Sequence, residues 1–330
     1  MKKHKFLKVI FINLVLIIIA LLIAEFWLNI RYYQNFQIHI DPEITKNYKI
    51  KDYVREYFYF TYRHYNKISM YFDHKQEPFD YLFHAEDLRE PVYSNSKNAE
   101  NVVLFGCSYT QGTTLTAEQS LHTKLNKYWN KSVYNYGVPG GSPKEALFFL
   151  KNLDKFDKRP NYNDVEYVIY TFIDDHEKRL VSNLNSTVPN FRKNKNGELE
   201  YVDSKFECIK LSYIYREINN LLYEKQLIKN TDENLLFYIK EINKEISNKF
   251  SNGNQKTKFI VFVYTDPIFG YPKFKEALEK ENITVINIKD FIDIDVTDPK
   301  YRTFDDHPSE YAWECIVPLL IKEIEKRSSF

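Results

Sequence analysis

Short apolar runs alternate with amphipathic segments from residue 101 onward, and this alternation constrains the fold more than any other feature. Segments of strand length, most of them apolar, lie at 102–105, 132–135, 165–172, 259–264 and 284–288. Segments with helical spacing of apolar side chains lie at 120–129, 143–155, 211–223, 232–250, 272–281 and from 309 onward. Buried parallel strands are continuously apolar, and the helices that connect them are amphipathic. The sequence therefore predicts an α/β fold with a parallel sheet covered by helices on both faces.

The first thirty residues do not belong to that sheet and instead form a candidate membrane-targeting segment. Three lysines lie among the first five residues, and residues 9–28 are apolar apart from Asn13 and Glu25. A helix of roughly twenty residues spans the ~30 Å hydrocarbon layer of a membrane. Positive charge before the span places Met1 in the cytoplasm and the bulk of the chain on the outer face. The alternatives are a cleavable signal peptide and a buried core helix.

Composition and charge limit the possible partners and domains. The 330 residues include 46 Lys and Arg against 45 Asp and Glu, and this balance argues against nucleic acid as the main partner. The 3 Cys form no C-x-x-C pair and no zinc-like cluster with His, so neither a disulfide framework nor a structural metal is expected. We expect an anchor over 1–30, a stalk and flap over 31–98, and an α/β domain over 99–330 with an insertion at about 180–253.

The turn after the first apolar run offers a candidate nucleophile. It reads Gly106-Cys107-Ser108-Tyr109-Thr110-Gln111-Gly112. A glycine at the end of the strand permits a tight turn, and Ser108 then lies at a helix N-terminus, where free backbone N–H groups face a developing oxyanion. Taken alone, a serine at a helix start also fits an ordinary helix cap.

The other end of the chain offers a candidate base. Asp305-Asp306-His307-Pro308 follows the last strand and precedes the last helix. A histidine beside a carboxylate, at the edge of the sheet that also carries a serine, is what nucleophilic catalysis by serine requires. The imidazole takes the serine proton, and the acid fixes the tautomer of the imidazole and stabilises its charged form.

Three segments resemble the motifs of the SGNH/GDSL hydrolases in the same order along the chain. The segment 105–112 is similar to the first block, usually Gly-Asp-Ser, and 135–143 is similar to the second, whose oxyanion glycine matches Gly140. The segment 305–308 is similar to the last block. The resemblance implies a flavodoxin-like α/β/α sandwich, ester hydrolysis or acyl transfer without a cofactor, and oxyanion donors at the N–H groups of Ser108 and Gly140. The N-terminal span is also similar to that of membrane-anchored bacterial members.

Two departures from the family pattern concern the nucleophile and the acid. Cys107 replaces the aspartate of the first block, which in the family supports the turn, and a thiol nucleophile at Cys107 is an alternative to Ser108. The acid of the last block usually precedes the histidine by three residues, where this chain has Phe304. A subset of the family places the acid two residues before the histidine, which assigns the role to Asp305 and leaves Asp306 as a solvated neighbour.

The third departure concerns the oxyanion hole. The third block usually ends in Gly-x-Asn-Asp, and its asparagine donates a hydrogen bond to the oxyanion. The chain reads Phe172-Ile173-Asp174-Asp175-His176, so Asp174 stands at the asparagine position. An ionised carboxylate ~4 Å from an oxyanion repels it by about 4 kcal/mol at an effective dielectric constant near 20. We hypothesise that His176 donates instead; the alternative is that His176 is an ordinary surface residue of the loop.

These observations predict an enzyme with Ser108 as nucleophile, His307 as base and Asp305 as the residue that orients His307. An anchored site on the outer face indicates acylated, chiefly acetylated, glycans of the cell envelope as substrates. Two other function classes stay open. One is a binding module that keeps the fold without catalysis, which Asp174 and Cys107 favour, and the other is a structural partner within a polysaccharide modification system.

Overall fold

The structure is a computed structural model that describes residues 11–28, 91–94, 100–153, 164–182, 190–193, 195–196, 199–202, 218, 231–250, 256–268 and 270–328. The chain divides into two compact units, one of residues 1–76 with 206–221 and one of residues 77–205 with 222–330. The second unit contains the sheet and every candidate site residue. The predicted helix at 211–223 and the predicted stalk at 31–98 lie almost entirely outside the described residues.

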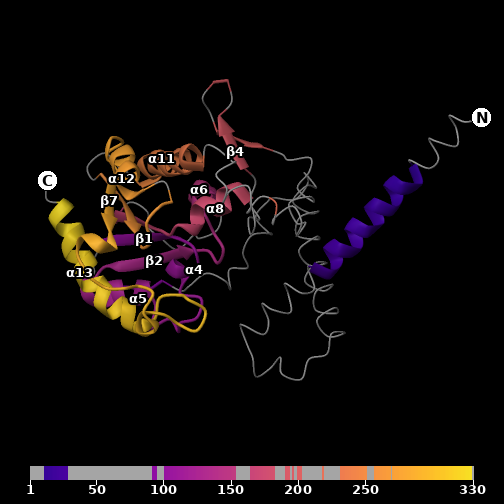
Figure 1. The fold of residues 1–330 in the computed structure, drawn as a ribbon. Helices are drawn as coiled ribbons and strands as arrows, with labels where there is room; N and C mark the ends of the chain where they lie inside the picture. The colour runs from indigo at the N-terminus through magenta and orange to yellow at the C-terminus, as the bar shows by residue number, and fades with distance from the viewer. Residues whose placement is uncertain are drawn as a thin grey trace, which may run out of the picture. The chain divides into compact units, whose positions relative to one another are not determined.

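Five parallel strands form the central sheet, in the order β2-β1-β3-β6-β7 (Figure 1). Their bounds are Asn101–Gly106 for β1, Ser132–Gly137 for β2, Val165–Phe172 for β3, Lys258–Val263 for β6 and Thr284–Asn287 for β7. β1 pairs with both β2 and β3, so the strand order reverses between β1 and β3. In doubly wound sheets, ligands bind at the carboxyl ends of the strands beside this switch point. The predicted fold class is confirmed.

Helices cover both faces of the sheet, because the apolar strands alternate their side chains between the two faces. On one face, Val103 and Phe105 of β1 pack in a core cluster with three helices. These are α6 (Pro143–Lys151), α11 (Thr231–Phe250) and α12 (Tyr271–Glu279). On the other face, Val102 and Leu104 pack with α5 (Leu121–Trp129) and α13 (Glu310–Ser328). Figure 1 shows the two helix layers on opposite sides of the strands.

The predicted strands and helices that fall on described residues are present, and several short elements were not predicted. Two short helices, α4 (Ser108–Gln111) and α8 (Asp175–Ser182), follow directly on β1 and β3; the helix start at Ser108 was predicted, and α8 was not. Two others, β4 (Asn190–Lys193) and β5 (Leu199–Val202), form an antiparallel pair inside the predicted insertion. Elements of four to eight residues are too short to show a helical period or a clear alternation in the sequence.

The N-terminal helix over Phe11–Leu28 is long and apolar enough to cross a membrane. Among the described residues it is the one helix with this property. An anchor and a signal sequence share this length and composition.

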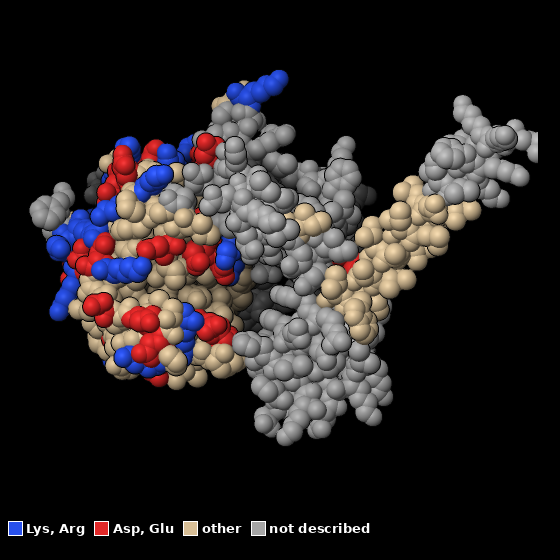
Figure 2. Space-filling view, in the orientation of Figure 1, with Lys and Arg blue, Asp and Glu red and all other residues tan. Residues whose placement is uncertain are grey.

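Charged side chains are mixed in sign on the face of the protein that Figure 2 shows. Basic and acidic groups lie beside one another there, and neither sign forms a continuous field among the described residues of this face. Proteins that bind nucleic acid usually present a basic stripe or patch. On this face the charge distribution thus agrees with the near-zero net charge of the chain.

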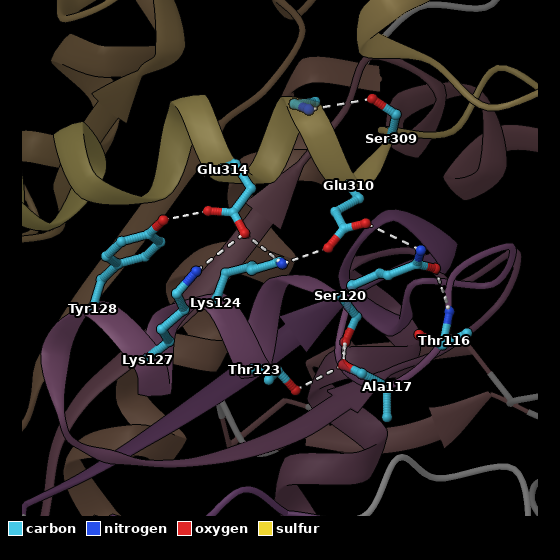
Figure 3. Close-up of polar contacts among 12 residues, drawn as sticks. Thr116, Ala117, Ser120, Thr123, Lys124, Lys127, Tyr128, Ser309, Glu310 and Glu314 are labelled. Atoms are coloured by element: carbon cyan, nitrogen blue, oxygen red, sulfur yellow. Dashed lines mark hydrogen bonds and ion pairs between the residues drawn. The ribbon is translucent and has the colours of Figure 1, made fainter.

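An ion-pair cluster fastens α5 to α13 (Figure 3). The Nζ atom of Lys124 on α5 lies 2.7 Å from Glu310 Oε1 and 2.6 Å from Glu314 Oε1, both on α13. The Lys124 side chain is buried, whereas Lys127, which also contacts Glu314, is exposed. α5 lies shortly after the nucleophile turn in sequence and α13 follows the loop of His307, so the cluster holds together two elements that bear on the site.

Replacing Lys124 with alanine is expected to lower the free energy of unfolding by about 1 kcal/mol. Hydrogen bonds to charged groups contribute about 1.5–3 kcal/mol, but both glutamates keep contact with water, which screens part of the interaction. Thermal or urea unfolding of the purified protein measures the change. Lys127→Ala is the matched control on the same helix, and a loss as large as that of Lys124→Ala would contradict a special role for the buried lysine.

Candidate active site

The nucleophile turn places Ser108 at the carboxyl end of β1. Ser108 is the first residue of α4, and the N–H groups of Thr110 and Gln111 both donate to the Cys107 carbonyl at 3.0 Å. Gly106 permits this tight turn, since a Cβ atom at that position would lie 2.1 Å from the hydroxyl oxygen of Thr110. The Ser108 side chain keeps a small exposed area at the switch point of the sheet.

The side chains of Ser108 and Asp305 contact opposite nitrogens of the His307 ring. The Oγ atom of Ser108 lies 2.7 Å from His307 Nε2. On the other side of the ring, His307 Nδ1 lies 3.0 Å from Asp305 Oδ2. The hydrogen bond of Nδ1 runs to the Asp305 backbone carbonyl at 3.2 Å, beside the carboxylate contact. One imidazole can therefore accept the serine proton at Nε2 while its Nδ1–H group faces Asp305, which is the arrangement that general-base activation of serine requires.

The environment of Asp305 keeps its carboxyl group ionised. Burial by itself raises the pKa of this group, but the hydrogen bond from Thr303 and the contact with His307 outweigh burial. The pKa of Asp305 therefore lies below its ordinary value. A carboxylate that stays charged stabilises the imidazolium that forms when His307 takes a proton.

A short closed loop carries both Asp305 and His307. The N–H group of Thr303 donates to the His307 carbonyl at 2.8 Å, and Arg302 and Pro308 form an antiparallel bridge outside this contact. Asp306, at the turn, has a φ of 65°, a value that aspartate tolerates better than most residues. Its carboxylate pairs with Arg302 at 2.9 Å and is largely exposed, which agrees with the prediction that Asp306 is a solvated neighbour of Asp305.

Tyr109 connects the nucleophile turn to this loop. Its hydroxyl donates to the Asp306 carbonyl at 3.0 Å, and its ring lies 5.1 Å from the His307 ring, centroid to centroid. The ring also meets Tyr264 edge-on at 5.4 Å. Burial raises the pKa of Tyr109 to about 12, so its hydroxyl stays protonated and can donate. Nothing in the sequence pattern distinguishes this tyrosine from the other 26 in the chain.

The Cys107 side chain does not face the site. It has no exposed surface and packs in the core cluster of the α5 and α13 face, with apolar side chains such as Leu104 and Ile173. Cys107 is the residue between β1 and α4, and its side chain turns into the core while Ser108 begins the helix. The alternative of a thiol nucleophile at Cys107 is therefore wrong for this structure.

The turn after β2 presents Gly140. The N–H group of Gly141 donates to the Val138 carbonyl at 2.8 Å, and Gly140 has a φ of 71°. Proline at the second position and a positive φ at the third are typical of a type II turn, which explains Pro139-Gly140. Arg179 of α8 holds the turn by donating to the Gly141 carbonyl at 2.8 Å.

Backbone N–H groups of the two predicted oxyanion donors have no acceptor among the described residues. This applies to Ser108, at the start of α4, and to Gly140, in the turn after β2. Free donors at a helix N-terminus and in an adjacent turn are suited to an anionic oxygen. Their role as oxyanion donors stays a prediction.

Asn135 supports the nucleophile turn from the neighbouring strand. Its side-chain Nδ2 donates to the Thr110 carbonyl at 2.8 Å, and its Oδ1 accepts from the Gly137 N–H at 2.9 Å. Gly137 is needed because a Cβ atom there would lie 2.4 Å from the backbone nitrogen of Gln111. The sequence indicated Asn135 only as the start of a motif, and its contacts show that it joins β2 to α4.

Asp174 is held by a reciprocal pair of hydrogen bonds with Thr265, which follows β6. The Asp174 N–H group donates to Thr265 Oγ1 at 2.8 Å, and this hydroxyl donates to Asp174 Oδ1, also at 2.8 Å. The pair fixes the orientation of the carboxylate at the carboxyl end of β3. Of its two oxygens, Oδ1 is occupied by Thr265, which leaves Oδ2 for other contacts.

His176 lies in the core, and this position disagrees with both interpretations that the sequence suggested for it. Its side chain has no exposed surface, so the alternative of an ordinary surface residue is wrong. The Nδ1 atom lies 2.7 Å from the Tyr170 hydroxyl, and the ring packs edge-on against Phe172. Burial, and then the charge of Arg179, hold the pKa of His176 well below its ordinary value. A neutral ring without exposed surface does not reach a substrate that enters from solvent, so the structure does not support the hypothesis of His176 as replacement donor.

The part of the chain that the structure describes contains no cluster of three or more His, Cys, Asp or Glu residues that could hold a metal ion. The expectation that the site needs neither metal nor cofactor stays a prediction.

Solved structures to which the chain is similar include esterases and a lipolytic protein. A psychrotrophic esterase from Pseudoalteromonas sp. matches at 11% identity over 70% of this chain and 100% of its own, with a TM-score of 0.42. A putative lipolytic protein of the G-D-S-L family from Desulfitobacterium hafniense matches at 13% identity over 67% of this chain and 97% of its own, with a TM-score of 0.38. The chain is similar to G-D-S-L proteins. An acetyl xylan esterase from Butyrivibrio proteoclasticus matches at 11% identity over 73% of this chain and 66% of its own, with a TM-score of 0.37.

No protein-family model and no curated protein matches the chain. At identities of 11–13%, the arrangement of this chain's own side chains decides what it can do.

Proposed function

We propose that the protein is a serine esterase or O-acyltransferase that acts on ester-linked acyl groups, chiefly acetyl groups, of cell-envelope carbohydrate. The observation that carries the proposal is the contact of His307 with Ser108 Oγ at one ring nitrogen and with the Asp305 carboxylate at the other. The three residues come from the two ends of an α/β domain, and 197 residues separate Asp305 from Ser108 along the chain. A serine, a histidine and an acid that meet in this order are the combination that nucleophilic catalysis by serine requires.

The reaction follows from the geometry of these groups. Ser108 Oγ attacks the acyl carbon while its proton passes to His307 Nε2, and Asp305 stabilises the resulting imidazolium through Nδ1–H. The N–H groups of Ser108 and Gly140 hold the tetrahedral oxyanion. When the intermediate collapses, His307 gives its proton to the departing alcohol, and the acyl group stays on Ser108.

The second half of the reaction regenerates the serine. His307 removes a proton from water or from a sugar hydroxyl as that oxygen attacks the acyl carbon, and it then returns the proton to Ser108 Oγ. Water gives a free acid, and a sugar hydroxyl gives a new ester. Hydrolysis and transfer thus use the same residues and differ only in the acceptor.

The proposed location of the catalytic domain supports a substrate in the cell envelope. We propose that the apolar segment Phe11–Leu28, preceded by lysines, anchors the chain in the membrane with the catalytic domain on the outer face. The exposed ring of Phe304, next to Asp305, offers an aromatic surface beside the site, of the kind on which sugar rings stack.

A second candidate function is a binding or accessory protein of envelope polysaccharide modification without catalysis. The observation that favours it is the Asp174 carboxylate at the position where a neutral donor is expected. A fixed negative charge beside the oxyanion opposes turnover but does not prevent the binding of a neutral glycan.

Purified full-length protein in detergent is expected to release p-nitrophenol from p-nitrophenyl acetate and acetate from acetylated glycans. When sugar acceptors are added, the rate at which the alcohol product is released should stay the same or increase. If the protein is a transferase, acetate production then falls as acetylated acceptor forms, and mass spectrometry of both products measures this partition. A wild-type protein that binds acetylated glycans but turns over neither substrate would favour the second candidate function.

A further inference from the structure

The carboxylate of Asp305 has two oxygens, and each has its own partner. Oδ2 lies 3.0 Å from His307 Nδ1. Oδ1 accepts a hydrogen bond from the hydroxyl of Thr303 at 2.6 Å. This distance is typical of a charge-assisted hydrogen bond between a hydroxyl and an ionised carboxylate. Thr303 thus binds the side of the acid that His307 leaves free.

A second threonine contacts Thr303 and belongs to the part of the chain that follows Ser108. Thr114, in the segment that follows α4, donates its hydroxyl proton to Thr303 Oγ1 at 3.1 Å. A hydroxyl has one proton and two acceptor sites. Thr303 can therefore receive a hydrogen bond from Thr114 while it gives its own proton to Asp305. Both threonine side chains are partly buried, which limits competition by water.

We propose that Thr303, supported by Thr114, is a positioning residue that holds Asp305 in register with His307. The inference rests on the proposed function, and it deepens the description of the same site. A single residue, Asp306, separates Asp305 from His307, and it lies in a turn with a positive φ. The carboxylate needs an external contact to stay aligned with Nδ1, and the Thr303 hydroxyl supplies it.

The other charged groups around the loop are engaged elsewhere. The Asp306 carboxylate pairs with Arg302, and Glu310, at the start of α13, pairs with Lys124. Within the part of the chain that the structure describes, His307 is the ion-pair partner of Asp305. The orientation of Asp305 therefore depends on Thr303 and His307, and removal of the Thr303 hydroxyl leaves its Oδ1 atom without that donor.

Thr303 also helps to close the loop, and this second role has to be separated from the first. Its N–H group donates to the His307 carbonyl at 2.8 Å, and its hydroxyl lies 3.2 Å from the same carbonyl. Valine at this position keeps the N–H group, the size and the β-branched shape of threonine. Thr303→Val thus removes the hydroxyl while the backbone contact of the loop remains.

Thr303→Val is expected to lower kcat for p-nitrophenyl acetate about tenfold with little change in KM, because the hydroxyl acts on the acid and not on the substrate. Thr303→Ser restores the hydroxyl and should return kcat to within about twofold of wild type. Thr297→Val is the matched control: the Thr297 hydroxyl donates to Asp295 Oδ1 at the same 2.6 Å and the same two-residue spacing, but on an exposed loop. It should leave kcat unchanged.

A double-mutant cycle with Asp305→Ala shows whether Thr303 acts through the acid. If it does, Thr303→Val costs about tenfold in the wild-type background and less than twofold when Asp305 is already alanine. An equal loss in both backgrounds, or no loss in an active wild-type protein, would overturn the positioning role of Thr303 alone. A wild-type protein without esterase activity would overturn the proposed function and this role together.

Discussion

Replacing Ser108 with alanine is expected to lower kcat/KM for p-nitrophenyl acetate by about 10⁴-fold or more. The alanine variant has no oxygen within reach of His307 Nε2, where the wild-type hydroxyl lies at 2.7 Å. The backbone N–H groups of the turn remain, so the residual rate reflects water attacking a bound ester. Initial rates of p-nitrophenol release by full-length wild-type and variant proteins, purified in the same detergent, measure the effect.

Cys107→Ala is the control for this experiment. Cys107 is the adjacent residue of the same turn, and its thiol is buried in the core. Its replacement is expected to lower stability slightly and to leave turnover within a few-fold of wild type. Retained turnover in Ser108→Ala, together with its loss in Cys107→Ala, would return the thiol to consideration as nucleophile.

Replacing Asp174 with asparagine is expected to raise kcat by at least about tenfold. A carboxylate ~4 Å from the oxyanion costs about 4 kcal/mol at an effective dielectric constant near 20, and a donor at such a site typically contributes 10²–10³ in kcat. Asparagine keeps an oxygen that accepts from the Thr265 hydroxyl, as Asp174 Oδ1 does at 2.8 Å. The amide group then takes the place of the second carboxylate oxygen, which converts an acceptor into a donor.

Asp175→Asn is the matched control for Asp174→Asn. Asp175 is the next residue, and its carboxylate pairs with Lys178 at 3.2 Å on the first turn of α8. Its replacement should change kcat by no more than about twofold. A loss of activity in Asp174→Asn would show that the carboxylate takes part in the reaction or in substrate binding, and it would contradict the interpretation of Asp174 as a defect of the oxyanion hole.

The sheet could be predicted from the sequence because its strands are continuously apolar and its helices amphipathic. β3 was predicted at its observed bounds of Val165–Phe172, and the other four strands within one or two residues. The start of α4 at Ser108 was predicted from the turn, but neither the length of α4 nor the presence of α8 could be predicted, because helices of four and eight residues show no clear period. Their positions depend on tertiary contacts such as that of Asn135 with Thr110.

The site could be predicted in part for a related reason. Ser108, His307 and Asp305 occur in motifs whose residue types and order are informative, and the structure brings these side chains together. Thr303 and Tyr109 act through hydrogen bonds that join distant segments, and threonine and tyrosine have too many ordinary roles to be selected from sequence. His176 was misjudged because its neighbours Asp174 and Asp175 are polar, whereas its own ring turns inward to the Tyr170 hydroxyl.

Covalent labelling of the full-length protein with a fluorophosphonate tests the central claim most directly, because this reagent phosphonylates a serine only when a base activates it. Peptide mass spectrometry locates the adduct, and His307→Ala serves as the variant in which activation is lost. We expect one adduct on the peptide with Ser108, absent from Ser108→Ala and strongly slowed in His307→Ala. Wild-type protein that stays unlabelled at Ser108, while a known serine esterase in the same reaction is labelled, would contradict the account of Ser108 as a catalytic nucleophile.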